Sequence, residues 1–237
     1  MVDTDRYAHP NRAMNPVWSP DSRFLAYEKQ QESHFKAIFV YDSKTGTIEQ
    51  VTDGIADATS PVWDQSGEYL YFLASTDYGL QTGWLDMSSY DPGLTRNLYA
   101  LVLTADGKAP GLPKSDEEEE VKKVTSSPDT KKEKKSKDKD EDKPEDVSVK
   151  IDFAGIMSRA VGLQMEPRNY AFLVPSKAKN VLVAEFIPNE NGLKLIKYEV
   201  EKGESEDLTT GLSSIVASSN AENILLQANG SWSISSS

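Results

Sequence analysis

Short apolar runs recur along the chain, and each is bounded by residues that favour turns. The clearest are residues 24–27 and 69–73, which read Phe-Leu-Ala-Tyr and Tyr-Leu-Tyr-Phe-Leu. Nearly continuous apolar runs of this length are typical of β-strands that are buried on both faces. Further strands are expected at residues 37–42, 97–103, 170–175, 181–186 and 193–200. The pattern predicts an all-β protein built from short strands.

The two clearest runs each follow the same short sequence motif, which therefore occurs twice. Residues 16–18 and 61–63 both read Pro-Val-Trp, and in each case a turn and an aromatic-aliphatic run follow in the same register. The turns contain Asp21-Ser22 and Ser66-Gly67; Asp and Ser hydrogen-bond their own backbone, and Gly adopts positive φ. A period of about 40–45 residues made of short strands is typical of a β-propeller blade. The alternative is two unrelated hairpins that share a tryptophan.

The repeats predict blades of four antiparallel strands. Four repeats can be placed, the last of them incomplete: residues 15–54, 60–104, 170–211 and 213–237. The fourth strand of the second blade is expected within residues 149–163. The chain then supplies about three and a half blades, whereas closed propellers have four to eight. We therefore expect a piece of a larger propeller in a longer protein.

The composition changes abruptly in the middle of the chain. Residues 114–146 are dominated by Lys, Glu, Asp, Ser and Pro, and they separate propeller residues 1–113 from propeller residues 147–237. A segment of this composition cannot bury enough apolar area to offset the entropy lost on ordering. We expect a disordered charged insert within the second blade, which is tolerated because loop-closure entropy grows slowly with length.

Overall composition narrows the classes of partner. The 237 residues suffice for one large all-β unit or two small domains. A formal net charge of −12 and a pI of about 4.7 argue against nucleic acid or an anionic membrane as partner. Absence of cysteine excludes disulfides and thiolate metal sites. The sequence has no membrane-spanning run, and its first residues lack the apolar core of a signal peptide.

Motifs for catalysis are missing from the sequence. It contains no Gly-x-Ser-x-Gly elbow and no Gly-rich phosphate loop. Its two histidines, His9 and His34, have neither ligand-spaced partners nor a recognisable nucleophile context. Residues 138–142 carry the alternating carboxylates of a calcium loop, but Lys143 stands where that loop needs Gly and Val149 where it needs Glu. We predict no catalytic, cofactor-binding or metal-binding residue.

The tryptophans are the remaining candidates for recognition. Because Trp18 and Trp63 share a repeat position, a packing role is favoured over ligand stacking. Trp84 lies in a long loop of the second repeat, near Asp86 and Tyr90. Loops held by a rigid scaffold often carry recognition. Trp84, Asp86 and Tyr90 are therefore the candidate partner-binding residues, with local packing of the loop as the alternative.

Several stretches of the sequence resemble known families of propeller proteins. The phrase at residues 15–22 resembles the Trp-Ser-Pro-Asp-Gly signature of TolB-like and related propeller repeats, which are WD-repeat-like. A closer resemblance is to tricorn-like serine proteases. It runs from about Asp3 to the C-terminus outside the charged insert, and it rests on residues 50–54, 58–63, 69–77 and 151–156 together with Arg159.

The resemblance implies a role beside a catalytic domain. Tricorn-like proteases carry one or two propellers ahead of a PDZ-like module and a domain with the nucleophilic serine, and their propellers filter or channel peptides. This chain matches only propeller blades, so no catalytic Ser, His or Glu is carried over. The family also forms large homo-oligomers, which makes self-association an expectation. Because many bacterial relatives are exported, a periplasmic location is slightly favoured over a cytoplasmic one.

We interpret the chain as the non-catalytic propeller portion of a tricorn-like serine protease that gates or channels peptides or unfolded polypeptides and supports assembly. The alternative is a TolB-like propeller scaffold that binds a protein partner with no protease attached. A propeller hydrolase or lyase is a third interpretation, disfavoured because paired catalytic groups are missing. The first two differ in whether the polypeptide continues into a PDZ-like module and a catalytic domain.

Overall fold

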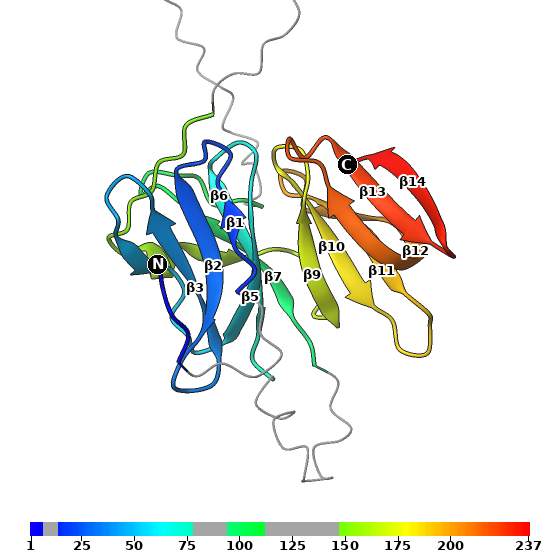
Figure 1. Cartoon of the computed structure of the whole chain (residues 1–237), viewed down its shortest axis with the longest axis horizontal. Helices are drawn as coiled ribbons and strands as arrows, with labels where there is room; N and C mark the ends of the chain where they lie inside the picture. Colours follow the sequence, from blue (N-terminus) through cyan, green and yellow to red (C-terminus); the bar gives the residue numbers. More distant parts are fainter. Residues whose placement is uncertain (7–13, 78–93, 112–146) are drawn as a thin grey trace, which may run out of the picture. The chain divides into compact units, whose positions relative to one another are not determined.

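The computed structural model describes residues 1–6, 14–77, 94–111 and 147–237. In these ranges the chain forms fourteen β-strands and one short 3₁₀ helix (Figure 1). The strands make three antiparallel sheets, so the predicted all-β class is confirmed. No helix of the described ranges is both long and apolar enough to cross a membrane.

The first sheet forms from consecutive strands, in the order β1-β2-β3-β4. Its strands are β1 (Val17–Trp18), β2 (Phe24–Gln30), β3 (Lys36–Asp42) and β4 (Ile48–Gln50). All four lie within the first repeat expected from the sequence. The buried residues of β2 and β3 include Phe24, Ala26, Ile38 and Val40. They lie in an apolar cluster that also contains residues of the second sheet.

The second sheet has the order β5-β6-β7-β8, and its last strand lies far along the sequence from the other three. Its strands are β5 (Asp57–Trp63), β6 (Tyr69–Ser75), β7 (Asn97–Val102) and β8 (Ala160–Gly162). Every residue of β5 and β6 is buried, as expected for strands covered on both faces. β8 pairs with β7 in antiparallel register, within the range where the sequence predicts this blade's fourth strand.

Residues 147–159 lead back into the second sheet and are anchored by one arginine. The guanidinium of Arg159, at the end of the 3₁₀ helix η3 (Ile156–Arg159), donates to the carbonyl oxygens of Val102 at 3.0 Å and Ala154 at 2.9 Å. It also donates to the carbonyl oxygens of Leu103 and Asp152. Arg159 therefore joins this returning segment to the end of β7 through backbone acceptors alone.

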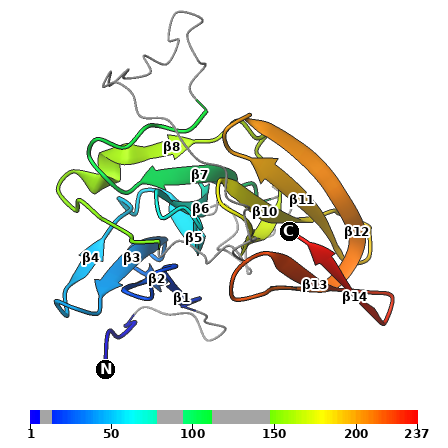
Figure 2. The same cartoon turned by 90° about the horizontal axis from the view of Figure 1, so that it is seen from above.

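The third sheet contains six strands rather than four. They are β9 (Tyr170–Pro175), β10 (Asn180–Phe186), β11 (Leu193–Glu199), β12 (Glu204–Ala217), β13 (Asn223–Ala228) and β14 (Ser231–Ser236). The boundary that the sequence suggests between residues 211 and 213 falls inside β12, which serves both predicted repeats. Pairing is irregular between Leu212 and Ser214, next to Gly211 with φ of 74°. Figure 2 shows β12 as one long, curved strand.

A common turn connects the first two strands of each unit. In each turn, a residue with left-handed backbone conformation (positive φ) stands three positions after a Ser or Asp. Ser22 (φ 57°) follows Ser19 in this way, and Gly67 (φ 75°) follows Asp64. The same spacing occurs at Lys179 (φ 60°) after Ser176 and Ala221 (φ 55°) after Ser218. The C-terminal strands therefore share this turn geometry with the other units, although β12 runs into them without a break.

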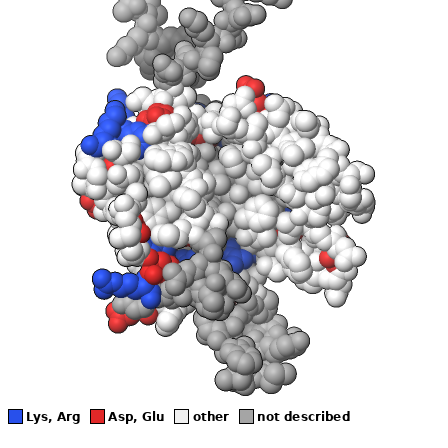
Figure 3. Space-filling model, viewed as in Figure 1, with Lys and Arg blue, Asp and Glu red and all other residues white. Residues whose placement is uncertain are grey.

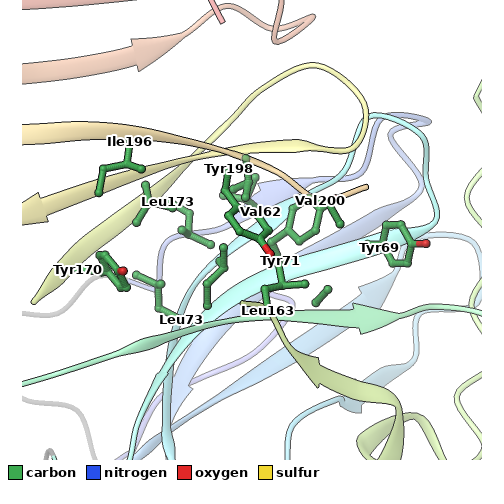
Figure 4. Packing of buried hydrophobic residues seen from close by; sticks show 14 of the residues in the cluster. Val62, Tyr69, Tyr71, Leu73, Leu163, Tyr170, Leu173, Ile196, Tyr198 and Val200 are labelled. Carbon is green, nitrogen blue, oxygen red and sulfur yellow. The ribbon is translucent and has the colours of Figure 1, made fainter. Parts of the chain in front are cut away.

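Three apolar clusters lie between successive units. One contains Phe24 and Ala26 of the first sheet with Trp63 and Leu70 of the second. The next joins Val62, Tyr71 and Leu73 of the second sheet to Leu173, Tyr198 and other residues of the third (Figure 4). The last lies within the third sheet, where β13 packs Ile224 and Leu226 on residues of β9 to β11. The units are thus packed face to face.

Within the described residues these sheets do not close into a ring. The four-stranded antiparallel units of the prediction are therefore present in the first two sheets, whereas the third sheet has six strands. Closure into a β-propeller remains a proposal.

Candidate functional site

Charged side chains from all three sheets meet at one end of the strands. Within the first sheet the end of β2 lies beside the start of β3, because the strands are antiparallel. The backbone N–H of Lys36, at the start of β3, donates to Asp57 at the start of β5, and a bridge between Arg96 and Arg168 links the second sheet to the segment before β9. We call this edge the charged end. Figure 3 shows mixed Lys, Arg, Asp and Glu side chains along the lower edge of that view. Its residues are Glu28, Lys36, Asp57, Arg96, Arg168, Glu185 and Lys194.

Glu28 is the most enclosed of these groups, with 1% of its surface exposed. Its carboxylate accepts hydrogen bonds from the side chains of Asn15 and Thr59 and, at 3.3 Å, from the backbone N–H of Ser60. Lys36 Nζ lies 3.3 Å from Oε1. A buried carboxylate requires partners of this kind. Through these hydrogen bonds Glu28 links β2 to β5, and therefore the first sheet to the second.

Asp57 at the start of β5 is also buried, and the backbone N–H of Lys36 donates to its Oδ1 at 2.8 Å. Burial raises the pKa of the Asp57 carboxyl above its ordinary value, although the hydrogen bond from Lys36 and the nearby charges of Lys36 and Arg96 oppose the rise. The direction follows because an apolar surrounding disfavours the ionised form. Asp57 is thus a carboxyl whose protonation is sensitive to nearby cations.

Ser60 lets one strand contact both neighbouring sheets. Its φ is 56°, and the pairing of β5 with β6 is irregular between Thr59 and Val62. Its backbone N–H donates to Glu28 of the first sheet, while its hydroxyl accepts a 2.7 Å hydrogen bond from the N–H of Leu173 in the third. A bulge of this kind re-aims a side chain and interrupts the ladder. β5 therefore holds the three sheets together at the charged end.

An open hollow of about 490 Å³ lies at the same end of the third sheet, with Arg168, Tyr170, Lys194, Ile196 and Asp207 in its wall. Arg168 lies 2.8 Å from Glu166, and Lys194 lies 2.8 Å from Asp207. The buried carboxylate of Glu185 lies between the two cations, 3.8 Å from Arg168 and 4.0 Å from Lys194. The hollow therefore presents both signs of charge beside apolar and aromatic surface.

The sequence-predicted partner residues cannot be placed in this arrangement. Trp84, Asp86 and Tyr90 lie outside the described residues, as does His9. The residues that flank their loop are described: Thr95 donates to Asp77 from its backbone N–H at 3.0 Å and from its hydroxyl at 2.7 Å. Since β6 ends at Ser75 and β7 begins at Asn97, the loop leaves from and returns to the charged end.

The histidine that can be placed does not join the site. His34 is exposed in the turn between β2 and β3, with φ of 65°, and its carbonyl oxygen accepts from the side chain of Gln30. Within residues 1–6, 14–77, 94–111 and 147–237, no group of three or more His, Cys, Asp or Glu side chains is arranged to hold a metal ion. His34 is therefore not part of the charged end.

Sequence reasoning missed most of the charged end. Glu28 and Glu185 follow directly on apolar runs, and each extends a strand that is otherwise buried. A charged residue in that position was the available signal, because a carboxylate at the end of a buried strand needs a partner from another element. These two partners could not be read from the sequence, since Thr59 and Ser60 lie beyond the repeat that contains Glu28.

Comparisons with known proteins support the fold. No protein-family model matches the chain. The uncharacterized peptidase YuxL of Bacillus subtilis is 25% identical over 114 residues, which are 41% of this chain and 17% of that protein. The crystal structure of the tricorn protease superimposes with a TM-score of 0.62 at 16% identity, over 99% of this chain and 22% of that one. TolB from Acinetobacter baumannii gives a TM-score of 0.51 at 13% identity, over 93% and 39%.

The resemblance to tricorn-like and TolB-like proteins is therefore confirmed at the level of fold. The chain spans less than a fifth of the curated relative that it matches, and about a fifth of the tricorn protease chain.

Proposed function

We propose that this chain is a non-catalytic portion of a β-propeller in a tricorn-like serine protease, where it gates or channels peptides and supports assembly. The observation that carries the proposal is the fold similarity to the tricorn protease, which extends over 99% of the chain. The face-to-face packing of four-stranded units suits a larger propeller, because each unit needs a neighbour to bury its apolar face.

The charged end supports the handling of peptides. An extended peptide carries an amine, a carboxylate and a polar backbone, and the hollow beside Arg168, Lys194 and Asp207 offers both cations and carboxylates. Exposed ion pairs contribute little free energy each. Contacts of this kind hold a peptide weakly and reversibly, as passage requires. The loop that contains Trp84, Asp86 and Tyr90 begins and ends at the same edge, and we propose these three residues as partner contacts.

Fluorogenic-peptide hydrolysis tests the catalytic part of the proposal. The purified chain is assayed beside the full-length product of its gene. We expect hydrolysis by the full-length protein alone, since the proposal places the chemistry outside this chain. Hydrolysis by the isolated chain, whether or not substitution of His9 and His34 affects it, would contradict the proposal. If neither protein hydrolyses the peptide, the result would favour the TolB-like scaffold described below.

Fluorescence anisotropy with a labelled unstructured peptide tests the peptide contact directly. We expect weak, salt-sensitive binding that decreases in Arg168→Gln and Lys194→Gln, because both changes remove charge from the hollow. Lys202→Gln is the matched control, since Lys202 is exposed and pairs with Glu199 outside the hollow. Equal loss in all three variants would show only a general charge effect.

The second candidate is a TolB-like scaffold that binds a protein partner with no protease attached. Similarity to TolB over 93% of the chain supports it. The two candidates differ in the remainder of the polypeptide: a PDZ-like module followed by a serine-containing catalytic domain supports the protease, and a polypeptide that ends after the propeller supports the scaffold.

A further inference from the structure

The loop between β13 and β14 consists of two residues, Asn229 and Gly230. They lie between Ala228 and Ser231, which pair with each other across the two strands. Both loop residues have positive φ, 51° at Asn229 and 76° at Gly230. A two-residue hairpin loop with positive φ at both positions is a type I′ turn, and Asn-Gly is among the sequences that this turn favours. The geometry of the hairpin therefore explains why these two residues stand here.

The Asn-Gly pair also has a chemistry of its own. The backbone nitrogen of the glycine can attack the side-chain carbon Cγ of the asparagine, because glycine has no Cβ to hinder the approach. A bond forms between this nitrogen and Cγ, the Cγ–Nδ2 bond breaks, and Nδ2 leaves as ammonia with the proton that the backbone nitrogen gives up. The product is a five-membered succinimide. Water opens the ring to aspartate or to isoaspartate, and no atom is oxidised or reduced.

The tip of the β13–β14 hairpin leaves room for this reaction. Asn229 and Gly230 are exposed, and so is every residue of β14. A Cβ built at Gly230 would meet nothing within 4 Å. Figure 2 shows the connection between β13 and β14 projecting from the third sheet. Segments with few buried contacts open locally at little cost in free energy. The tip can therefore leave the turn geometry and bring the backbone nitrogen of Gly230 to Cγ of Asn229.

The position of this loop at the end of two strands keeps it accessible in a larger propeller as well. At the junctions described above, successive units pack through the faces of their strands, as Trp63 and Leu70 do against Phe24. A further unit packed on β13 and β14 in the same way would cover the faces of these strands. The tip with Asn229 and Gly230 lies outside such contacts.

The second Asn-Gly pair of the sequence, Asn191-Gly192, is held in place. Asn191 is exposed like Asn229. However, the Cβ position of Gly192 lies 2.7 Å from the carbonyl carbon of Gly211 and 2.8 Å from the carbonyl oxygen of Leu212. Leu193, the next residue, pairs with Leu212. The backbone of β12 therefore packs directly against Gly192, and the movement that the attack requires must first break this contact.

We propose that Asn229 is a site of spontaneous modification, at which attack by Gly230 converts the side-chain amide into aspartate and isoaspartate, whereas Asn191 is protected by the contact of Gly192 with β12. Water is the only other reactant. Both products add one negative charge, and isoaspartate also adds one methylene group to the backbone. Because the length of a hairpin loop fixes the pairing of its strands, the longer backbone disturbs the pairing of Ala228 with Ser231.

Peptide mapping by mass spectrometry tests the proposal on the whole chain, incubated in warm, mildly alkaline buffer. Replacement of NH₂ by OH raises the mass of the peptide that contains Asn229, and chromatography separates its isoaspartate form from its aspartate form. At early times we expect at least about tenfold more conversion at Asn229 than at Asn191, which corresponds to a difference of about 1.4 kcal/mol in the free energy of local opening. Equal conversion at the two sites, or none at Asn229, would overturn the proposal.

Incubation in concentrated urea separates the effect of the structure from that of the sequence. The unfolded chain lacks the contact between Gly192 and β12, so we expect Asn191 and Asn229 to convert at similar rates. A preference for Asn229 that is just as large in urea would show that the structure does not protect Asn191, and it would contradict the proposal.

Gly230→Ala is the variant that tests the attacking atom. The added methyl group lies beside the backbone nitrogen, so conversion at Asn229 should slow severalfold while conversion at Asn191 stays unchanged. The variant is measured in urea as well as in buffer, because alanine at a φ of 76° strains the folded turn. An unchanged rate at Asn229 would show that this nitrogen is not the nucleophile. Since the site lies outside the charged end, peptide mapping can fail without affecting the proposed function, and the reverse also holds.

Discussion

The indole nitrogen of Trp63 donates a 3.0 Å hydrogen bond to the carbonyl oxygen of Val17, across the junction between the first and second sheets. The ring lies among buried apolar residues, with Phe24 6.4 Å away between ring centroids. The repeated Pro-Val-Trp phrase therefore has a structural use: the tryptophan of one repeat binds the valine backbone of the repeat before it.

Trp63→Phe should weaken this junction. The change removes the hydrogen bond and leaves space where the indole was, so we expect a loss of about 1–3 kcal/mol in the free energy of unfolding, measured in urea. Trp18→Phe at the equivalent, half-exposed position should change it by less than about 0.5 kcal/mol. Equal effects of the two substitutions would show that the junction does not depend on the Trp63 contact.

Gly67→Ala should destabilise the chain more than Gly46→Ala does. Both glycines have φ near 75°, where an L-residue costs about 1–2 kcal/mol. An added Cβ at Gly67 would lie 3.1 Å from Val147 and 3.2 Å from Val149, whereas at Gly46 it meets nothing within 4 Å. The difference between the two unfolding free energies measures the contact alone, and a difference of zero would show that the valines move aside freely.

Asp42 should make the first sheet sensitive to acid. The hydrogen bonds from Arg23, one of them 2.8 Å long, lower the pKa of Asp42 to about 2. A carboxyl with a pKa below its unfolded value adds stability that is present above pH of about 4 and lost as the pH falls toward 2. Arg23→Gln should therefore lose stability above pH 4 and converge with the native chain near pH 2.

Urea unfolding midpoints measured across this pH range test the prediction. Lys202→Gln, which removes an exposed cation, serves as the control and should follow the native profile. A constant gap between Arg23→Gln and the native chain at every pH would indicate that Arg23 acts through packing rather than through the carboxylate.

Glu28→Gln should be strongly destabilising although it preserves size. The carboxylate faces donors on every side, from Asn15, Thr59, Ser60 and Lys36. An amide would turn one NH₂ toward another donor, so we expect a loss of about 2–4 kcal/mol in the free energy of unfolding. Asp207→Asn, at an exposed ion pair, should cost less than about 1 kcal/mol. A small effect at Glu28 would mean that water or rearranged side chains replace the lost contacts.

Much of the strand pattern could be predicted because its signals are local. The apolar runs at residues 24–27 and 69–73 became the buried parts of β2 and β6, and the turn formers beside them became the left-handed turns at Ser22 and Gly67. Burial on both faces leaves a run without alternation, and a tight turn requires residues that tolerate positive φ. Both properties can be read from a few neighbouring residues.

The remainder depends on contacts between distant residues. The sequence suggests a boundary at Gly211, but β12 continues through it. The strand continues because Ile215, beyond this glycine, is buried with Leu182 of β10 and Leu195 of β11. The charged end depends on the contact between Glu28 and Thr59, which are 31 residues apart in the sequence. Trp84, Asp86 and Tyr90 remain predictions, since they lie outside the described residues.

The separation of β7 from β8 has a consequence for the newly made chain. Residues 103–159 lie between these paired strands, so the ribosome adds 57 residues after β7 before its partner emerges. At about 5–20 residues per second, that delay is on the order of 3–11 s. During this delay one edge of β7 has no paired strand. The carbonyl oxygens of Val102 and Leu103 also lack the hydrogen bonds that Arg159 later donates to them. The first sheet can be complete during synthesis, while the second must remain open to other edges or to a chaperone.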